Sequence, residues 1–420
     1  MVFSTIRHKT FASLKIRNYR LYFFGQTISR VGTWMQTIAI GWLALQLTGS
    51  GTQLGTIISM MFLPILILGA WGGVIADRFD KRRTIIYVQA AMSALALVMS
   101  VLVFSGLIQV WMLYVFALFY GLARAVDEPV RSTFVSDMVE SAYVKNAVSL
   151  NSTMNNLARI IGPAIGGALI LGVGIAFAFF INAISYAAVI FMLLRMREQE
   201  LHHRRIEQNR GANIKAGLKY CLETPLIREL LLTAAIVGTF AYEWQVSLPL
   251  LAERVFAGDA GTYASLMSAL GVGAVIGGLV AASRHKVAPR SILLFVFFLG
   301  VSMVTTAFMP TLELAMIGIA VVGFFSVSFT ALGSTMMQLE SVHEMRGRVM
   351  ALWGVAMLGS TAIGGPIIGF IGDNIGARWG LAAGGFSALI AVGIAAYPLL
   401  EKRFRTIPED EPIEGAPTAV

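Results

Sequence analysis

Charged residues are scarce in this chain. Asp, Glu, Lys and Arg make up 13% of its 420 residues, whereas soluble domains carry about 25%. Hydrophobic residues make up 57%, and the mean hydropathy is +0.74. A water-soluble core cannot bury this much apolar surface. The composition therefore excludes an ordinary soluble domain and predicts a protein that crosses a membrane many times.

Cysteine is almost absent as well, because Cys221 is the only one. A single cysteine excludes a disulfide framework and a cysteine-based metal site. The glycine run "GVGAVIGG" at 271 lies inside an apolar segment and does not resemble a phosphate-binding loop, which disfavours ATP-driven transport. The net charge of +9 does not indicate a nucleic-acid partner, since the basic residues lie between apolar runs. We expect no metal, no cofactor and no nucleic acid.

Long apolar runs make up most of the sequence. A helix needs roughly 20 apolar residues to span the hydrocarbon layer, and irregular backbone facing lipid would leave polar groups unpaired. The sequence therefore predicts an all-α membrane protein with about twelve transmembrane helices, at residues 20–47, 53–76, 84–104, 110–136, 145–170, 174–194, 227–250, 262–283, 290–309, 312–337, 349–371 and 378–400.

The positions of the basic residues predict the orientation of these helices. If the N-terminus is cytoplasmic, only Arg254 and Arg378 of the 32 Lys and Arg residues fall in outer loops. The opposite orientation would place most of the basic residues outside. We therefore predict a multi-pass protein of the bacterial inner membrane with both termini in the cytoplasm.

The two halves of the chain resemble each other. "GGVIADRFDKRR" at 72 matches "GGLVAASRHKVA" at 277, and Pro163 and Pro366 are separated by a similar interval, roughly 200 residues. The repeat predicts two pseudo-symmetric six-helix bundles with a binding site between them. The expected division is a first bundle at 1–195, a cytoplasmic linker with an amphipathic helix at 196–225, a second bundle at 226–402 and a disordered cytoplasmic tail at 403–420.

The charged loop at 72–83 separates the second and third apolar runs. A loop that served only to fix orientation would need basic residues but no acid, so Asp77 requires another explanation. The pattern G-x-x-x-D-R followed by a basic cluster resembles the signature loop of the major facilitator superfamily. The stretches "RNYRLYFFGQTIS", "NAVSLNSTMNNLARIIGPAIGG" and "RGRVMALWGVAMLGSTAIGGP" resemble its enterobactin-exporter branch.

The resemblance implies that this loop is a gate latch. Asp77 would lie at the inner end of span two, near the N-terminus of span eleven, where a carboxylate interacts favourably with the helix dipole. Arg78 and Lys81 would reach carboxylates on neighbouring helix ends, with Asp137 as a candidate. The chain departs from the superfamily at Asp80, where glycine is usual.

A second motif lies in the fifth span, where "GPAIGG" resembles a sequence associated with exporters. It comprises Gly162, Pro163, Gly166 and Gly167. Proline removes a backbone donor and bends the helix, and the glycines allow a neighbouring helix to approach closely. By analogy the motif favours export over import, although generic membrane packing would also explain it.

Ionisable residues within spans are costly and are therefore functional candidates. The sequence offers Arg30, Arg124, Asp127, Glu128, Arg159 and Glu243. Asp127 and Arg159 lie at similar depths on adjacent spans, which predicts an ion pair. Glu243 has no basic neighbour in sequence and is the first candidate for proton coupling, with Arg30 as a candidate partner and with Asp127 and Glu128 as the next candidates. The alternative is that Glu243 faces a solvated vestibule.

Polar and aromatic side chains near these charges are candidates for an amphipathic substrate cavity. They are Gln26, Trp34, Gln36, Asn151, Asn155, Tyr242 and Trp244. The sequence as a whole favours a monomeric secondary-active transporter and not an enzyme. We expect a proton-coupled exporter of a drug or siderophore that works by alternating access. The alternatives are a transporter of lysophospholipids or similar lipids and, in a different class, a receptor or scaffold that transports nothing.

Overall fold

A computed structural model describes residues 11–202, 214–284 and 287–400, without the side chains of 69–78, 214 and 397–400. Helices and short connections make up all of this part of the chain. The predicted tail at 403–420, residues 203–213 of the predicted linker and the side chains of Asp77 and Arg78 lie outside the described part.

The first six long helices form one bundle. Short 3-10 helices at Ala12–Lys15, Ser141–Tyr143 and Glu198–Glu200 accompany them. The long helices are α2 (Arg17–Thr48), α3 (Gly51–Arg78), α4 (Lys81–Phe104), α5 (Val110–Asp137), α6 (Val144–Val173) and α7 (Ile175–Leu194).

The short helix α8 (Ile214–Glu223) precedes the second bundle and packs against α14. The helices of the second bundle are α9 (Pro225–Phe240), α10 (Trp244–Arg254), α11 (Ala260–Ala282), α12 (Pro289–Ala307), α13 (Leu312–Glu340), α14 (Arg346–Gly354), α15 (Thr361–Asn374) and α16 (Ala377–Leu400). Together with the first bundle they complete the predicted arrangement of twelve transmembrane segments.

Eleven of these segments are long and apolar enough to cross a membrane, judged over the described residues. The remaining segment is the first span, α2, which is more polar. It has 32 residues and packs against α6 and α7. Its polar residues Gln26, Ser29 and Gln36 are buried among protein side chains. Burial inside the bundle explains how a less apolar helix can cross the membrane.

Two of the predicted spans are interrupted. The seventh breaks at residues 241–243, between α9 and α10, and the eleventh contains a π-helical turn at Val355–Gly359 between α14 and α15. Backbone groups freed by such breaks are tolerated at membrane depth only where protein or a water-filled cavity surrounds them. π-turns inside α-helices are frequent at functional sites. Both interruptions therefore mark regions where function is expected.

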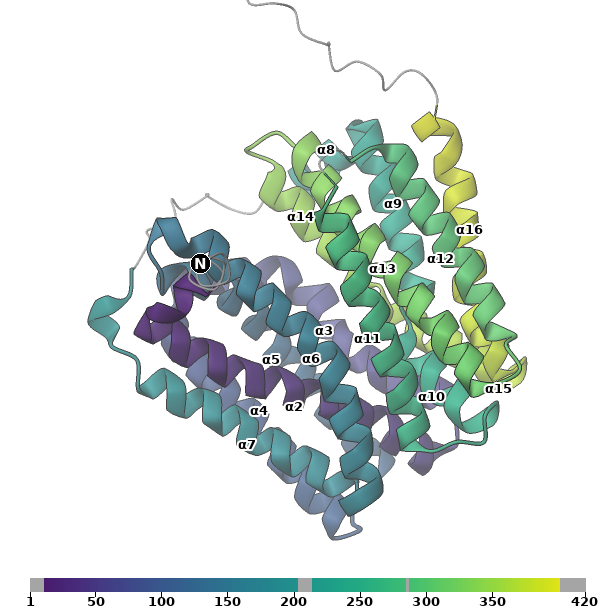
Figure 1. The fold of residues 1–420 in the computed structure, drawn as a ribbon, viewed down its shortest axis with the longest axis horizontal. Coiled ribbons are helices and arrows are strands. Elements are labelled where there is room, and N and C mark those ends of the chain that lie inside the picture. The colour runs from purple at the N-terminus through teal and green to yellow at the C-terminus, as the bar shows by residue number, and fades with distance from the viewer. Residues whose placement is uncertain (1–10, 203–213, 285–286, 401–420) are drawn as a thin grey trace, which may run out of the picture.

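Figure 1 shows the two bundles converging at one end and diverging at the other. We call the diverging end, where α8 and α14 lie, the linker end, and the other the opposite end. Two antiparallel helix pairs join the bundles, α3 with α15 and α6 with α11. These two pairs position the residues discussed below that connect the bundles.

Candidate functional site

Small residues hold α3 and α15 together near the opposite end. Gly51, Gly55 and Ser59 repeat at every fourth position on α3 and face Gly369, Gly365 and Thr361 on α15. A Cβ atom added to Gly55 would collide with the carbonyl oxygen of Gly365. Such spacing lets two membrane helices touch along their backbones. Toward the linker end the eleventh span stays close to α3, because a Cβ atom added to Gly359 would lie 3.2 Å from the Cα atom of Leu66.

The predicted exporter motif contributes to two interfaces. Gly162 lies against Trp34 of α2, and Gly166 lies against Met35 of the same helix. Gly167 instead faces Ala264 of α11, in the other bundle. The motif therefore tightens the first bundle and also brings the second bundle close.

An acid that the sequence analysis did not single out closes the opposite end. The carboxylate of Asp373, at the end of α15, accepts hydrogen bonds from the backbone N–H groups of Gly51 (2.6 Å) and Thr52 (2.8 Å), at the start of α3. It also accepts from the hydroxyls of Ser50 (2.8 Å) and Thr52 (2.7 Å). Asp373 thus joins the C-terminus of a helix in one bundle to the N-terminus of a helix in the other.

Arg254, at the end of α10, completes this group. Its guanidinium lies 2.9 Å from the Asp373 carboxylate and donates to the carbonyl oxygen of Gly49 at 2.8 Å. Because Gly49 belongs to the first bundle, Arg254 also bridges the two. From the sequence, Arg254 is predicted only as a residue of an outer loop, and its neighbours in the chain give no sign of this bridging role.

At the linker end, the predicted contact between Lys81 and Asp137 is present. Lys81 lies 2.7 Å from Asp137, and both side chains are largely buried. These residues start α4 and end α5, so the pair lies within the first bundle. Asp80 accepts a hydrogen bond from the backbone N–H of Arg83 (2.7 Å) and caps α4. Helix capping explains why an acid is accommodated where the superfamily usually has glycine.

The predicted ion pair between Asp127 and Arg159 is wrong. Asp127 pairs instead with Arg131, one turn further along α5, at 2.6 Å, and it accepts a hydrogen bond from Gln89 of α4 at 3.1 Å. Arg131 is not among the intramembrane charges predicted from the sequence. Similar depth on neighbouring helices does not ensure that two side chains face each other, whereas residues four apart on one helix do.

Arg30 and Glu128 form the second pair of this network. The two guanidinium nitrogens of Arg30 contact the two carboxylate oxygens of Glu128 at 2.9 and 3.3 Å. Arg30 is therefore not the partner of Glu243. Gln26 links the pairs further by accepting a hydrogen bond from Arg131. The network ties α2, α4 and α5 together and balances two cations with two acids.

Two other predicted charges have no such compensation. Within the described residues, neither Arg124 nor Arg159 pairs with a carboxylate. The Arg124 guanidinium lies 5.5 Å from the ring centre of Phe62, and that of Arg159 lies 5.6 Å from the ring centre of Trp34. The interior of the first bundle therefore carries excess positive charge.

Arg159 also lies at the interface between bundles. Gly271 of α11 packs against its backbone carbonyl, and Tyr242, at the break in the seventh span, is close enough to interact with it electrostatically. Asn155 lies one turn earlier on α6. Its side-chain amide oxygen is buried and has no hydrogen-bond partner in the described part of the chain. The structure thus brings together the predicted residues Trp34, Arg159 and Tyr242.

Glu243 is buried at the break in the seventh span, with 2% of its surface exposed. In the described part of the chain, neither carboxyl oxygen makes a hydrogen bond of good geometry, although the Thr361 side chain is close enough to interact. One oxygen lies beside Gly364 of α15. The solvated alternative is therefore wrong for this conformation, and Glu243 lies between spans seven and eleven.

The remaining cavity candidates are dispersed. Gln36 accepts a hydrogen bond from Asn182 of α7 (2.7 Å) and faces the interior of the first bundle, so its prediction as a cavity residue fails in this conformation. Gln26 belongs to the charge network, and Trp244 is buried against Tyr242, with ring centres 5.8 Å apart. Asn151 lies on α6, half-buried.

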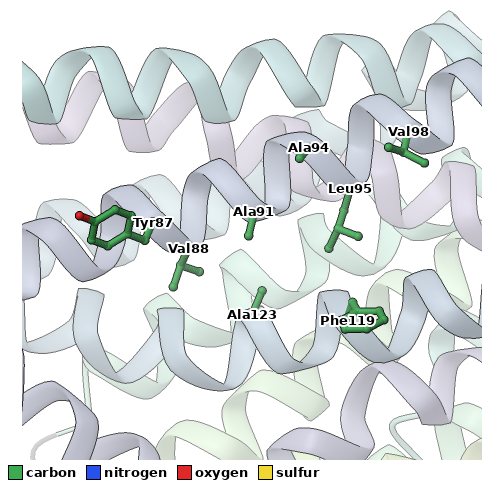
Figure 2. A pocket seen from close by; sticks show the side chains of 8 residues that line it. All are labelled: Tyr87, Val88, Ala91, Ala94, Leu95, Val98, Phe119 and Ala123. Atoms are coloured by element: carbon green, nitrogen blue, oxygen red, sulfur yellow. The ribbon is translucent and has the colours of Figure 1, made fainter.

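An apolar groove of about 530 Å³ lies between α4 and α5, away from these charges. Figure 2 shows its lining, which comprises Tyr87, Val88, Ala91, Ala94, Leu95, Val98, Phe119 and Ala123. None of the predicted site residues contributes to it. Its exposed hydrophobic side chains suit contact with lipid, and apart from the Tyr87 hydroxyl its lining offers no polar or charged group to recognise a charged substrate.

The fold, with its paired bundles and interrupted spans, agrees with the comparison to known sequences. Residues 8–411 match the family described as transmembrane secretion effector. The chain belongs to this family of the major facilitator superfamily. It is therefore a multi-pass membrane transporter.

Several relatives cover most of the chain. The transporter YfiS of Bacillus subtilis, described as uncharacterized, is 29% identical over 84% of this chain and 85% of its own. The staphyloferrin A transporter of Staphylococcus aureus is 24% identical over 79% of this chain and 84% of its own. The enterobactin exporter EntS of Shigella flexneri is 24% identical over 93% of this chain and 94% of its own.

Solved structures share the fold at low sequence identity. A peptide transporter of the POT family aligns with a TM-score of 0.74 and 14% identity, covering 91% of this chain and 95% of its own. A bacterial homologue of the lysosomal transporter Spinster, in an inward-facing and unoccupied conformation, aligns with a TM-score of 0.67 and 14% identity, with the same coverage. These likenesses establish the architecture and not the substrate.

Proposed function

We propose that this chain is a proton-coupled exporter of a small amphipathic molecule with acidic groups, such as a siderophore, in a bacterial inner membrane. Arg159 carries the proposal. Its guanidinium lies over Trp34 at the interface between bundles and pairs with no carboxylate among the described residues. A charge kept in the membrane interior without compensation is costly and marks a functional site.

An acidic group on the substrate would supply the missing charge. Arg binds carboxylates and similar anions with two parallel hydrogen bonds. The Trp34 ring and the Tyr242 side chain near Arg159 would contact the apolar part of the same molecule. This combination favours an amphipathic anion over a cationic drug, because a cation would add to the positive charge of Arg124 and Arg159.

Proton coupling is assigned to Glu243. Asp127 and Glu128 are held by arginines, whereas Glu243 is buried and pairs with no cation in the described part of the chain. An ionised carboxylate is costly in such surroundings. Glu243 is therefore expected to be protonated in this conformation and to lose its proton when the seventh and eleventh spans separate.

The direction of transport is inferred from the relatives, and the conformation is one that an exporter adopts when it loads substrate. The bundles converge at the opposite end and diverge at the linker end (Figure 1). With both termini in the cytoplasm, as the basic residues predict, the linker end faces inward and the substrate enters from the cytoplasm. The names of the relatives EntS and the staphyloferrin A transporter support a siderophore as cargo.

A ligand-dependent thermal shift tests the binding part of this proposal. Purified protein is heated with a catecholate siderophore, a carboxylate siderophore, a cationic dye or a lysophospholipid. We expect stabilisation by one of the siderophores and its loss in Arg159→Gln. Arg195→Gln is the matched control, because Arg195 also lies over an aromatic ring, that of Phe191, but is exposed at the linker end. Stabilisation only by the dye or the lysophospholipid would reject the proposal.

A further inference from the structure

The contacts of Asp373 have the form of a latch between the two bundles. The carboxylate belongs to α15, whereas the N–H groups of Gly51 and Thr52 and the hydroxyl of Ser50 belong to the first bundle. One oxygen, Oδ2, accepts from Ser50, from the backbone of Thr52 and from its hydroxyl, and the other, Oδ1, accepts from Gly51 and contacts Arg254. Both oxygens of the carboxylate therefore make hydrogen bonds across the contact between the bundles at this end.

Charge makes these contacts stronger than a neutral side chain could. The first N–H groups of a helix have no intrahelical partner and carry a partial positive charge. A carboxylate satisfies them with charge-assisted hydrogen bonds. Here the capping acid comes from a different helix in a different bundle, more than 300 residues away in the chain. Capping of α3 and closure of the opposite end are therefore one event.

We propose that Asp373 is the gating residue that holds the opposite end of the transporter closed while the linker end is open. The inference rests on the proposed alternating access and adds the group that biases its equilibrium. When the opposite end opens, α3 and α15 must separate and the carboxylate must exchange its partners for water. About a fifth of the Asp373 side chain is already exposed, so water can reach it as the helices part.

A second acid, Asp77, lies at the other end of α3, the linker end. The sequence places Asp77 near the end of α3, where the resemblance to the superfamily predicts a latch with the start of the eleventh span. Asp77 would then cap the start of the eleventh span, in α14, whereas Asp373 at the end of that span caps α3. The two latches would act in opposite directions, because the bundles cannot converge at both ends while they rock.

Pulse electron paramagnetic resonance distances test the proposal directly. Spin labels at Leu107 and Glu313, which are exposed on the two bundles at the opposite end, report its opening. Labels at Glu140 and Glu340 report the linker end. Cys221→Ala provides a background free of other thiols.

The test variant is Asp373→Asn, which keeps the size of the side chain but places an NH₂ group among hydrogen-bond donors. We expect it to raise the population with a separated opposite end by about fivefold or more.

Asp259→Asn is the matched control. Asp259 also caps a helix at the opposite end, but it caps α11 in its own bundle, and in the described part of the chain no hydrogen bond or ion pair joins it to the first bundle. The distance distributions of the Asp259→Asn variant should match those of the wild type. Asp373→Glu should restore part of the closed population, because the charge returns. Unchanged distances in a monodisperse Asp373→Asn protein would overturn the latch.

The distances also separate this inference from the proposed function. If Asp373→Asn shifts the distances but no siderophore binds, the latch stands and the substrate class is wrong. If siderophores bind through Arg159 but the distances do not respond, the substrate class stands and the latch is wrong.

Discussion

The carboxylate of Asp127 lies 2.6 Å from the guanidinium of Arg131, one turn away on α5 and deep inside the first bundle. With Arg30 and Glu128 this pair forms a network of balanced charge among α2, α4 and α5. The balance implies a structural role, because each charge stabilises its partner in a medium that disfavours both. It leaves Arg124 and Arg159 without a carboxylate partner among the described residues, and Arg159 is the one that we propose binds the substrate.

The first prediction concerns this pair. Arg131→Ala should destabilise the protein more than the double variant Asp127→Ala/Arg131→Ala. The single variant leaves an unpaired buried carboxylate, which costs about 3–5 kcal/mol. Thermal unfolding in detergent, analysed as a double-mutant cycle, measures the coupling. The cycle of Asp127 with Arg159 is the control and should show additive effects. Equal coupling in both cycles would contradict the assignment.

The second prediction concerns Glu243. Glu243→Gln should retain substrate binding and lose transport driven by a pH gradient, because the amide keeps the shape of the carboxyl but cannot exchange a proton. Substrate transport is measured in proteoliposomes with and without an imposed pH gradient. Glu229→Gln is the control, since Glu229 is a buried acid on α9 that is paired with Arg228 at 2.9 Å. Gradient-driven accumulation by Glu243→Gln would show that the coupling site lies elsewhere.

The third prediction concerns the contact between α3 and α15. Gly55→Ala should weaken closure of the opposite end, because the added methyl group would collide with the backbone of Gly365. Overpacking of this kind typically costs about 1–3 kcal/mol. Gly393→Ala on α16 is the control, since nothing lies within 4 Å of its added Cβ. Thermal stability and the distance between labels at Leu107 and Glu313 provide the readout. If Gly55→Ala behaves like Gly393→Ala, the close helix contact has no energetic role.

The fourth prediction compares the two acids of this helix pair. Asp77→Asn should shift the equilibrium in the direction opposite to Asp373→Asn, towards a closed opposite end and an open linker end. A residue needed only for folding would not produce shifts of opposite sign. The labels at Glu140 and Glu340 record the change. Shifts of the same sign would mean that only one of the two acids acts as a latch.

Composition and periodicity were sufficient to predict the helices. Twelve apolar runs became twelve transmembrane segments in two bundles, because lipid leaves the backbone few alternatives. The break at 241–243 was not predicted, since neither glycine nor proline occupies those positions. The π-turn in the eleventh span was not predicted either, although Gly354 and Gly359 lie at its two ends; it packs against α3 and α9.

The site was harder to predict than the fold. Depth along a helix can be counted from the sequence, but the direction of a side chain around the helix depends on packing, which is why Asp127 was paired with the wrong arginine. Asp373 was missed because its partners are distant in the sequence. The repeats of small residues at Gly51 and Gly55 and at Gly365 and Gly369 were the available signals, and they show where two helices meet without naming the acid beside them.

Transport across a membrane is the most direct test of the central claim. Purified protein is reconstituted in proteoliposomes with an imposed pH gradient, and uptake of a labelled catecholate or carboxylate siderophore is compared among wild type, Arg159→Gln and Arg195→Gln. We predict concentrative transport by wild type and Arg195→Gln that collapses when the gradient is dissipated, and little transport by Arg159→Gln. Gradient-driven transport of a cationic dye, with no transport of either siderophore and no effect of Arg159→Gln, would contradict the account.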